Sequence, residues 1–362
     1  MSALSDQLLV VAIMSYVAAM VCHAAEYAFG NQSHIGRAAS RPARELVAVG
    51  GGSTAVLDEV VEEVDEAPPP RRDRAAIAGM AAVVVTAIAA LVHLGTLVTR
   101  GIAAERMPWG NMYEFVLSVT FVGTAAWLVV LSRRPAIRHL GLFVATAMVL
   151  LLGIAGMVLY TEVAPLVPAL KSTWFIVHVM AAVLSSGIFL LGFVPAAMFL
   201  IRSGYDRGKR AFPYSLGRRV PEAAALDRLT FRLHAFAFPI WTFGALIAGP
   251  IWAEAAWGRY WGWDPKEVWA FISWIVYAGY LHARATPSVK RTTATWIAVI
   301  GWLTMLMNLF GVNIFFTGLH SYGACRAESG WNCRSGPGLR NNKNQIGDGF
   351  EDLSNFGRFL GA

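Results

Sequence analysis

The stretch AIAGMAAVVVTAIAALVHLGTLVT, residues 76–99, contains no charged side chain and only one that can ionise near neutral pH, His93. A helix of about 20 apolar residues spans the hydrocarbon core of a lipid bilayer, which is roughly 30 Å thick. The stretch is long enough to span the bilayer and lacks the clusters of glycine and proline that mark a loop. It therefore predicts a transmembrane helix.

The same kind of apolar run recurs along the chain. Hydrophobic residues make up 56% of the sequence and charged residues only 15%, a composition outside the range of ordinary soluble domains. With residues 76–99 the chain has eight candidate spans, of which the sixth and seventh are short or interrupted. We therefore predict an all-α, polytopic bundle of about eight transmembrane helices, the other seven at residues 7–29, 112–131, 140–160, 174–201, 233–251, 268–284 and 293–316.

The net charge of +7 follows the topology rather than suggesting a nucleic-acid partner. Twenty lysines and arginines fall in alternate connecting segments, and only five fall in the segments on the opposite side. The positive-inside rule then predicts a multi-pass protein of the cytoplasmic membrane. Its N-terminus and the segment around residues 257–271 lie on the outer side, and the basic segments are 30–75, 132–138, 202–232 and 282–292.

Four regions follow from these patterns. Residues 1–29 form the first transmembrane helix, retained because it lacks a basic leader and a clear cleavage site. Residues 30–75, with an acidic run and three prolines, are predicted to be a flexible cytoplasmic linker. Residues 76–322 form the transmembrane core. Residues 323–362 are polar and aperiodic and are predicted to be a disordered external tail, in which a disulfide between Cys325 and Cys333 stays open.

The segment WGRYWGWDPKEVWAF, residues 257–271, concentrates aromatic side chains beside Asp264, Lys266 and Glu267. Six of the thirteen tryptophans of the chain lie within residues 252–274. Tryptophan also gathers in belts at membrane interfaces, but a belt spreads over many helix ends and needs no such motif. We interpret the segment as an aromatic platform for a large planar ligand.

Two histidines lie on the same predicted side as this platform. His178 is at the outer end of the fifth span and His320 follows the eighth. Each alone suits a structural role, but two imidazoles beside one aromatic loop suit axial coordination of an iron held in a macrocycle. We therefore predict that haem binds there, with these two histidines as axial ligands and the platform residues Trp252, Trp257, Trp261, Trp263, Asp264 and Trp269 around it.

The other histidines divide into two groups. His282 stands at the cytoplasmic end of the seventh span and would belong to a second, inner iron site. His93 lies within the second span without an evident partner in the sequence. We expect structural roles for the remaining four, which are His23, His34, His139 and His234.

The run RGIAAERMPWGNMYEF, residues 100–115, places Arg100 and Arg106 where the positive-inside rule expects few cations. Two interpretations are open: the arginines anchor helix ends among lipid headgroups, or they pair with haem propionates or a partner. Glu114 either begins the third span or joins a network that faces the interior.

These motifs resemble one family. WGRYWGWDPKEVWAF looks like the tryptophan-rich WWD signature of haem-handling membrane proteins, and WDPKE followed by GYLHAR resembles the CcsA (ResC) family of system II cytochrome c biogenesis. PWGNMYEF, KSTWFIVHV and GLHSY resemble further elements of that family, in the same order. The resemblance covers about residues 76–322, and the long acidic linker and the tail depart from it.

The resemblance implies a route for haem b, as a transported substrate, across the membrane to a CxxCH segment of apocytochrome c. The outer haem ligands correspond to His178 and His320, and the inner one to His282, opposite a ligand from a CcsB (ResB)-type membrane partner. Thiol-reducing thioredoxin-like proteins would keep the acceptor cysteines reduced. The chain itself contains no CxxCH and no evident nucleophile or general base, so it would act within a holocytochrome c synthase complex by orienting its substrates.

Two other functions are compatible with the sequence. One is a haem exporter or chaperone that passes its cargo to a separate ligase. The other is a b-type membrane electron carrier, which needs histidine pairs that bridge helices across the bilayer. One outer pair and a lone inner histidine argue against the electron carrier.

Overall fold

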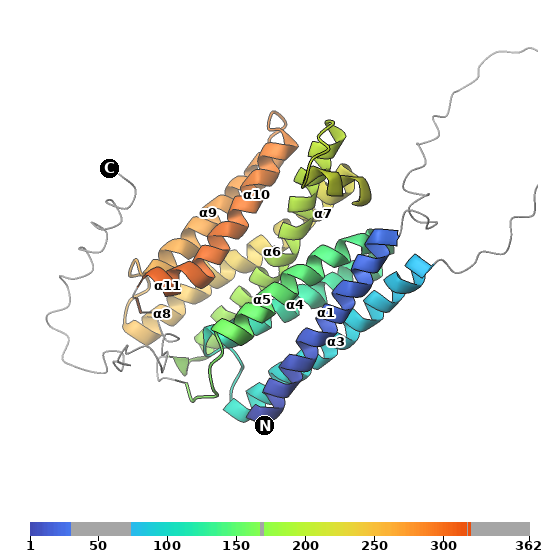
Figure 1. The fold of residues 1–362 in the computed structure, drawn as a ribbon. Helices are drawn as coiled ribbons and strands as arrows, with labels where there is room; N and C mark the ends of the chain where they lie inside the picture. Colours follow the sequence, from blue (N-terminus) through green and yellow to red (C-terminus); the bar gives the residue numbers. More distant parts are fainter. Residues whose placement is uncertain (30–73, 167–169, 317, 320–362) are drawn as a thin grey trace, which may run out of the picture. The chain divides into compact units, whose positions relative to one another are not determined.

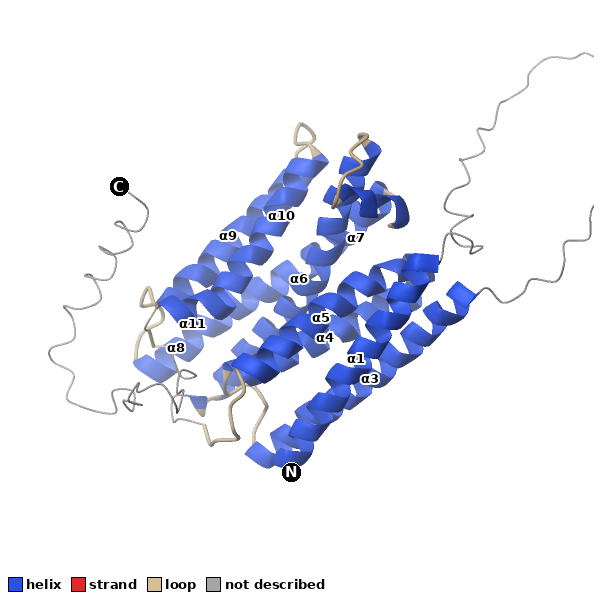
Figure 2. Ribbon diagram, viewed as in Figure 1, coloured by secondary structure: helices blue, strands red, loops and turns tan. Residues whose placement is uncertain are grey.

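The computed structural model describes residues 1–29, 74–166, 170–316 and 318–319, and this part of the chain is helical with no strand (Figures 1 and 2). Most of the predicted linker and tail, together with His34, His320, Cys325 and Cys333, lies outside the described residues. The helices are α1 (Ser2–Phe29), α3 (Arg74–Ala104), α4 (Met112–Arg133), α5 (Gly141–Val158), α6 (Thr173–Asp206), α7 (Ala223–Phe243), α8 (Gly249–Trp257), α9 (Pro265–Ala285), α10 (Arg291–Leu306) and α11 (Val312–Phe315).

Four shorter helical segments connect or interrupt these helices. Two are 3₁₀ turns, Pro135–Leu140 before α5 and Tyr214–Arg219 before α7. Two are single π-helical turns, Gly244–Ala248 between α7 and α8 and Met307–Gly311 between α10 and α11. A π turn widens the helix by one residue and frequently marks a functional site.

Seven helices of the described residues are long and apolar enough to cross a membrane, which confirms a polytopic helical membrane protein. The predicted sixth span is longer than expected, because α7, the π turn and α8 form one continuous helix over Ala223–Trp257. The predicted seventh span, 268–284, corresponds to α9, whose Trp, Tyr, His and Arg side chains make it less apolar than the other seven. Its crossing of the membrane stays a prediction.

Helix α6 is central to the bundle within Met1–Gly318. It packs against α4, α7 and α10, and 72% of its most apolar window is buried, more than in any other candidate span. Helices α1 and α3 pair along their length, and α9 pairs with α10 (Figure 1). The side of α3 away from these contacts exposes apolar side chains such as Met80, Val84 and Leu91, which suits contact with lipid tails.

The two ends of the bundle differ in chemistry. One end, called here the aromatic end, carries the start of α1 and the connections 105–111, 159–166 and 258–264. The other, called the basic end, carries the connections 134–140, 207–222 and 286–290. This arrangement agrees with the alternation of charge in the sequence, whereas the side of the membrane that each end faces stays a prediction.

Candidate functional site

His178 is held at the aromatic end by a backbone carbonyl. It lies in the second turn of α6, is partly exposed, and its Nδ1 is 2.8 Å from the carbonyl oxygen of Gly244. Because a carbonyl oxygen can only accept, Nδ1 carries the proton in the neutral ring and Nε2 carries the lone pair. A histidine that ligates a metal is commonly oriented in this way by a hydrogen bond from its other nitrogen.

The π turn explains why this carbonyl is available to the ring. Gly244 begins the π turn, so its oxygen accepts from the amide of Gly249, five residues later, as well as from His178. Neither position leaves room for a larger residue: a Cβ atom on Gly249 would lie 3.1 Å from the His178 ring, and one on Gly244 would lie 2.9 Å from Ala181. The two glycines therefore allow α6 and the π turn to approach closely enough for the hydrogen bond.

Aromatic rings pack behind His178. The Trp252 ring is buried and stacks on the imidazole with a centroid distance of 5.6 Å and an interplanar angle of 16°. Phe175 and Trp257 also contact Trp252, with 5.4 and 4.8 Å between ring centroids. These rings fix the plane of the imidazole, so Trp252 supports the histidine rather than forming an open surface.

The exposed part of the aromatic loop is a different set of side chains. Trp263 is 66% exposed and Tyr260 is 63% exposed, while Trp261 and Trp269 are partly buried. Trp263 has a φ of 57°, in the left-handed region that a tryptophan rarely adopts. Backbone strain of this kind persists where the surroundings impose it, commonly at ligand sites. The loop thus presents a large aromatic ring outward at a conformational cost.

The motif Asp264–Glu267 starts α9 by a capping box. The Asp264 side chain accepts from the amide of Lys266 at 3.3 Å, and the Glu267 carboxylate accepts from the amides of Gly262 and Asp264 at 2.8 and 3.1 Å. Pro265 occupies the first helical position, where its missing N–H costs nothing. The sequence S/T/D-x-x-E is a known signal for such a cap, so this structural role of the two acids was open to prediction.

The end of the described core reaches the same loop. Gly318 lies against Asp264, since a Cβ atom on Gly318 would be 2.5 Å from its Oδ1. His320, two residues later in the sequence, lies outside the described residues.

The arginines of the 100–115 run are engaged within the protein. Arg100 is fully buried, and its Nε donates to Glu114 Oε1 at 2.9 Å; Arg106 Nη1 donates to Glu114 Oε2 at 2.6 Å. The amide of Gly110 donates to the same carboxylate at 2.8 Å, and the guanidinium of Arg100 also donates to the Thr161 carbonyl. Glu114 is thus the centre of an interior network, one of the two roles that the sequence left open, and it occupies both arginines.

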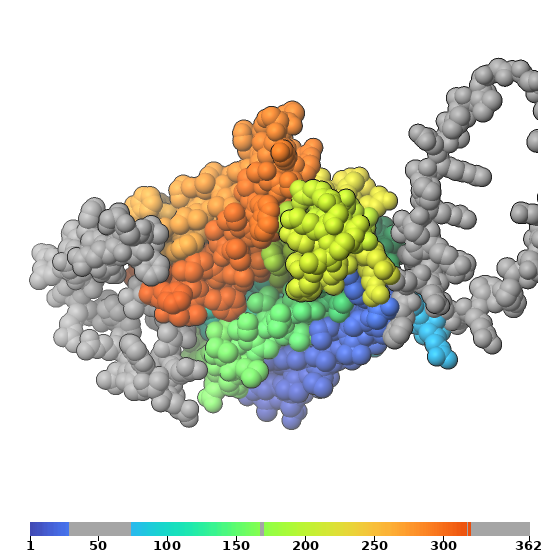
Figure 3. Space-filling view, turned by 45° about the horizontal axis from the view of Figure 1, so that its top comes forward, coloured from blue at the N-terminus to red at the C-terminus, as the bar shows by residue number. Residues whose placement is uncertain are grey.

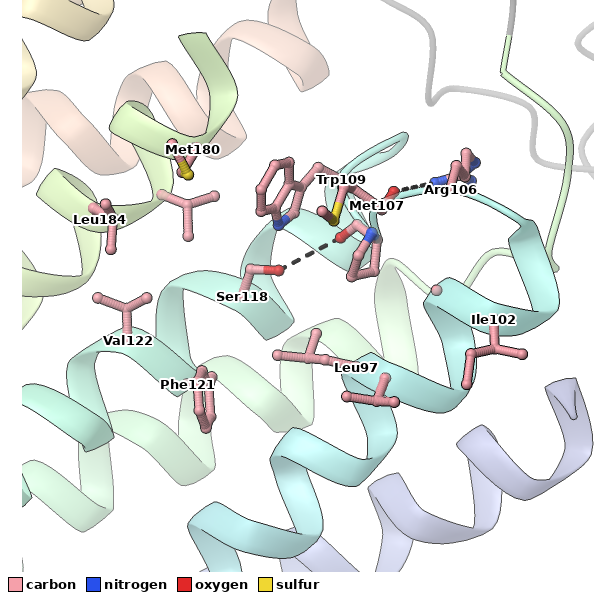
Figure 4. A pocket seen from close by; sticks show the side chains of 14 residues that line it. Leu97, Ile102, Arg106, Met107, Trp109, Ser118, Phe121, Val122, Met180 and Leu184 are labelled. Carbon is pink, nitrogen blue, oxygen red and sulfur yellow. Dashed lines mark hydrogen bonds between the residues drawn. The ribbon is translucent and has the colours of Figure 1, made fainter. Parts of the chain in front are cut away.

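A cavity of about 610 Å³ lies beside this network, between α3, α4 and α6 (Figure 4). Its walls are almost wholly apolar, with Leu97, Phe121 and Leu184 along α3, α4 and α6 and Trp109 at one end. Arg106 lines it too, but its side chain bonds to Glu114 and to the Met107 and Ala164 carbonyls. No histidine of the described residues lines the cavity, so it is not a candidate for the axial coordination predicted from the sequence.

The other predicted histidines occupy distinct environments. His282 is exposed near the basic end of α9. His93 is fully buried between α1, α3 and α4, with its Nδ1 3.3 Å from the Tyr16 hydroxyl and its ring edge-on to Tyr16 and Phe121. It does not join the aromatic end. His23, also buried, lies 3.9 Å from Glu26, which pairs with Arg138 at the basic end.

Together these features define a class: a polytopic helical membrane protein with an aromatic loop and a carbonyl-oriented histidine at one end of its bundle. Residues 109–320 match the family described as Cytochrome C assembly protein, and the chain belongs to this family. It is 33% identical over 261 residues to the cytochrome c biogenesis protein CcsA of Guillardia theta, covering 68% of this chain and 85% of that protein.

Two more relatives have the same description. The cytochrome c biogenesis protein CcsA of Gloeobacter violaceus is 31% identical, over 66% of this chain and 85% of its own length. The CcsA protein of Cyanophora paradoxa is 30% identical, over 63% of this chain and 82% of its own length. The family resemblance found in the sequence motifs is thereby confirmed.

Proposed function

We propose that this protein carries haem b to the aromatic end of its bundle and presents it for thioether attachment to a CxxCH segment of apocytochrome c. Membership of the cytochrome c assembly family supports a role in cytochrome c maturation. The observation that carries the finer proposal is the hydrogen bond between His178 Nδ1 and the Gly244 carbonyl, because it presents Nε2 as the basic nitrogen of an oriented imidazole.

The donor set suits iron that arrives in a macrocycle. Among the described residues, no group of three or more His, Cys, Asp or Glu side chains is placed to hold a bare metal ion. A porphyrin supplies four equatorial nitrogens, so the protein has to supply only axial imidazoles and a flat apolar surround. His178 would supply one, and His320, which lies outside the described residues, would supply the other.

The aromatic loop would hold the porphyrin face. Trp263 and Tyr260 expose their rings on the loop that leads into the capped start of α9. Trp252 stacks on His178 and prevents the imidazole from rotating away. In this arrangement the protein contributes orientation and proximity, and bond formation between vinyl group and thiol belongs to haem and the acceptor peptide.

His282 suits a site that a second protein completes. Its side chain is exposed on α9, and one turn earlier a Cβ atom on Gly279 would meet nothing within 4 Å. Ile275, two turns earlier, is also 48% exposed. A partner of the CcsB (ResB) type would supply the opposing ligand against this face. Thioredoxin-like reductants would supply the reduced thiols.

The decisive experiment uses the full chain purified in lipid nanodiscs with its ResB-type partner. We expect His178→Ala to lose low-spin haem absorbance and holocytochrome formation from a CxxCH peptide, and added imidazole to restore both in part. The control is Ile176→Ala, an exposed side chain on the same turn of α6 that should change neither. Unchanged haem absorbance in His178→Ala contradicts the axial role. Haem binding without thioether formation in the unmodified complex favours the exporter function.

A further inference from the structure

Buried polar groups without partners concentrate between α7 and α9. In the described part of the chain, thirteen buried side-chain nitrogen and oxygen atoms have no hydrogen-bond partner in the protein, and seven of them lie on these two helices. They are Asp227 Oδ1, His234 Nε2, Trp241 Nε1, the hydroxyls of Tyr277 and Tyr280, and Nε and Nη1 of Arg284.

Contacts place most of these groups in a single row along the α7–α9 interface, called here the polar file. At the basic end, Arg284 Nη2 pairs with Asp227 Oδ2 at 3.2 Å. One turn further in along α9, the Tyr280 ring lies edge-on to His234, with 5.0 Å between centroids. The ring of Tyr277 follows, and its centroid lies 5.4 Å from the centroid of the same imidazole. The file therefore runs from the Arg284–Asp227 pair inward to His234.

The tautomer of His234 leaves its Nε2 atom as a hydrogen-bond acceptor. Nδ1 is 2.8 Å from the carbonyl oxygen of Thr230, four residues earlier on α7, and so it carries the proton in the neutral ring. Nε2 then carries a lone pair in a residue that is only 1% exposed. It needs a donor, and no protein group within hydrogen-bond distance provides one.

The surrounding helices are shaped to accommodate these polar rings. A Cβ atom on Gly192 of α6 would lie 2.7 Å from the His234 ring, and one on Gly301 of α10 would lie 2.6 Å from the Tyr277 ring. Phe189 of α6 stacks on Tyr277 at 3.9 Å and 3°. Glycines on two different helices thus make room for a histidine and a tyrosine at membrane depth, where apolar side chains would otherwise pack.

We propose that the α7–α9 interface holds a cluster of internal water molecules, which extends from the Arg284–Asp227 pair to Nε2 of His234. A buried polar group without a hydrogen bond costs more free energy than a typical hydrogen bond contributes, so native proteins satisfy nearly all of them with protein or ordered water. Internal waters bind where several such groups converge, as they do here.

The cluster connects a titratable side chain with the basic end of the bundle. Asp227 and Arg284 are 15% and 8% exposed at their side chains, so the outermost members of the file approach the surface. In Figures 1 and 3 the end of the α9–α10 pair lies next to the segment that joins α6 and α7. The polar groups therefore form a continuous series from the buried His234 to side chains that lie near the basic end.

Radiolytic footprinting of the full chain in nanodiscs tests the proposal, since hydroxyl radicals formed from bound water label adjacent tyrosines. We expect Tyr277 and Tyr280 to be labelled several-fold faster than Tyr16. Tyr16 is a matched control, because it is 1% exposed and its hydroxyl has His93 as a protein partner. Labelling no faster than that of Tyr16 overturns the proposal.

A variant gives a second test, in which the direction of the change in melting temperature distinguishes a hydrated interface from a dry one. Tyr277→Phe keeps the ring and removes only the hydroxyl, which has no protein partner. If that hydroxyl bonds to water, its loss lowers the melting temperature and slows the labelling of Tyr280. If the interface is dry, removing an unsatisfied group relieves a cost and raises the melting temperature. A rise, or no change, in the melting temperature overturns the water cluster and leaves the proposed haem function untouched.

Discussion

The aromatic end contains two regions built on opposite principles. The Arg100–Glu114–Arg106 network is closed: Glu114 is fully buried, and its two oxygens accept from both guanidinium groups and a backbone amide. The His178 region is open: the imidazole is partly exposed, and Trp263 is exposed on a strained backbone. A buried and satisfied network stabilises one arrangement, whereas an oriented ring beside exposed aromatics suits the haem site that we propose.

The largest expected effect comes from opening the closed region. Glu114→Gln leaves Arg100 buried without a counter-charge, and removing one partner of a buried ion pair costs about 3–5 kcal/mol. Thermal or denaturant unfolding in detergent measures the loss. Glu162→Gln, an exposed acid at the same end, is the control and should leave stability unchanged. Equal stability of the two variants would mean that the network contributes little.

A smaller effect is expected from moving the ring of His178 without removing it. Gly249→Ala places a Cβ atom about 3.1 Å from the imidazole and displaces it from the Gly244 carbonyl. Loss of a supporting hydrogen bond commonly lowers metal affinity about 10–100-fold, and we expect haem affinity to fall within that range. Haem titration followed by absorbance measures it. Gly153→Ala, where a Cβ atom meets nothing within 4 Å, should bind haem normally.

Strain at Trp263 can be separated from its ring by two substitutions. Trp263→Gly and Trp263→Ala both remove the exposed indole, and both should weaken haem binding. Only glycine adopts a φ of 57° freely, so the Gly variant should be more stable than the Ala variant by about 1 kcal/mol. Paired haem titrations and unfolding curves measure the two effects. Haem affinity unchanged in both would exclude the ring from the site.

The last comparison concerns the pH dependence of stability. Desolvation lowers the pKa of Lys266 to about 8, and the neighbouring Asp264 carboxylate opposes this shift. Between about pH 8 and 10.5 the unfolded chain binds more protons at this lysine than the folded chain, so stability should rise with pH across that window. Lys266→Met should flatten the profile, while Lys171→Met, an exposed site at the same end, should leave it unchanged. If stability still rises with pH in Lys266→Met, the pH dependence belongs to another titratable group.

Some of the site was readable in the sequence because it depends on local patterns. The apolar runs predicted the helices, since a chain in hydrocarbon must satisfy its backbone internally. The WDPKE motif also contained a capping box, a local signal that the aromatic interpretation of the segment passed over. The pairing of Arg100 and Arg106 with Glu114 was harder to foresee, because all three lie within one short run whose turn geometry decides which charges meet.

The burial of the histidines could not be predicted from the sequence. His234 and His282 both lie towards the basic end, in helices of similar character, yet one is 1% exposed and the other is exposed. Nothing in the neighbouring residues distinguishes them, because the difference depends on where α6 packs against α7 and α9. The polar file between α7 and α9 has the same origin and had no signal along the chain.

The sequence by itself determined the class of the protein, its family and the residues that crowd the aromatic end, because hydrophobic length and motif order are properties of the chain alone. Only the tertiary structure decided which imidazole is oriented, which is buried and which is exposed. The physical reason is that hydrogen bonds such as the one from His178 to Gly244 join residues 66 positions apart. Their formation depends on the packing of α6 against a π turn, which no local pattern specifies.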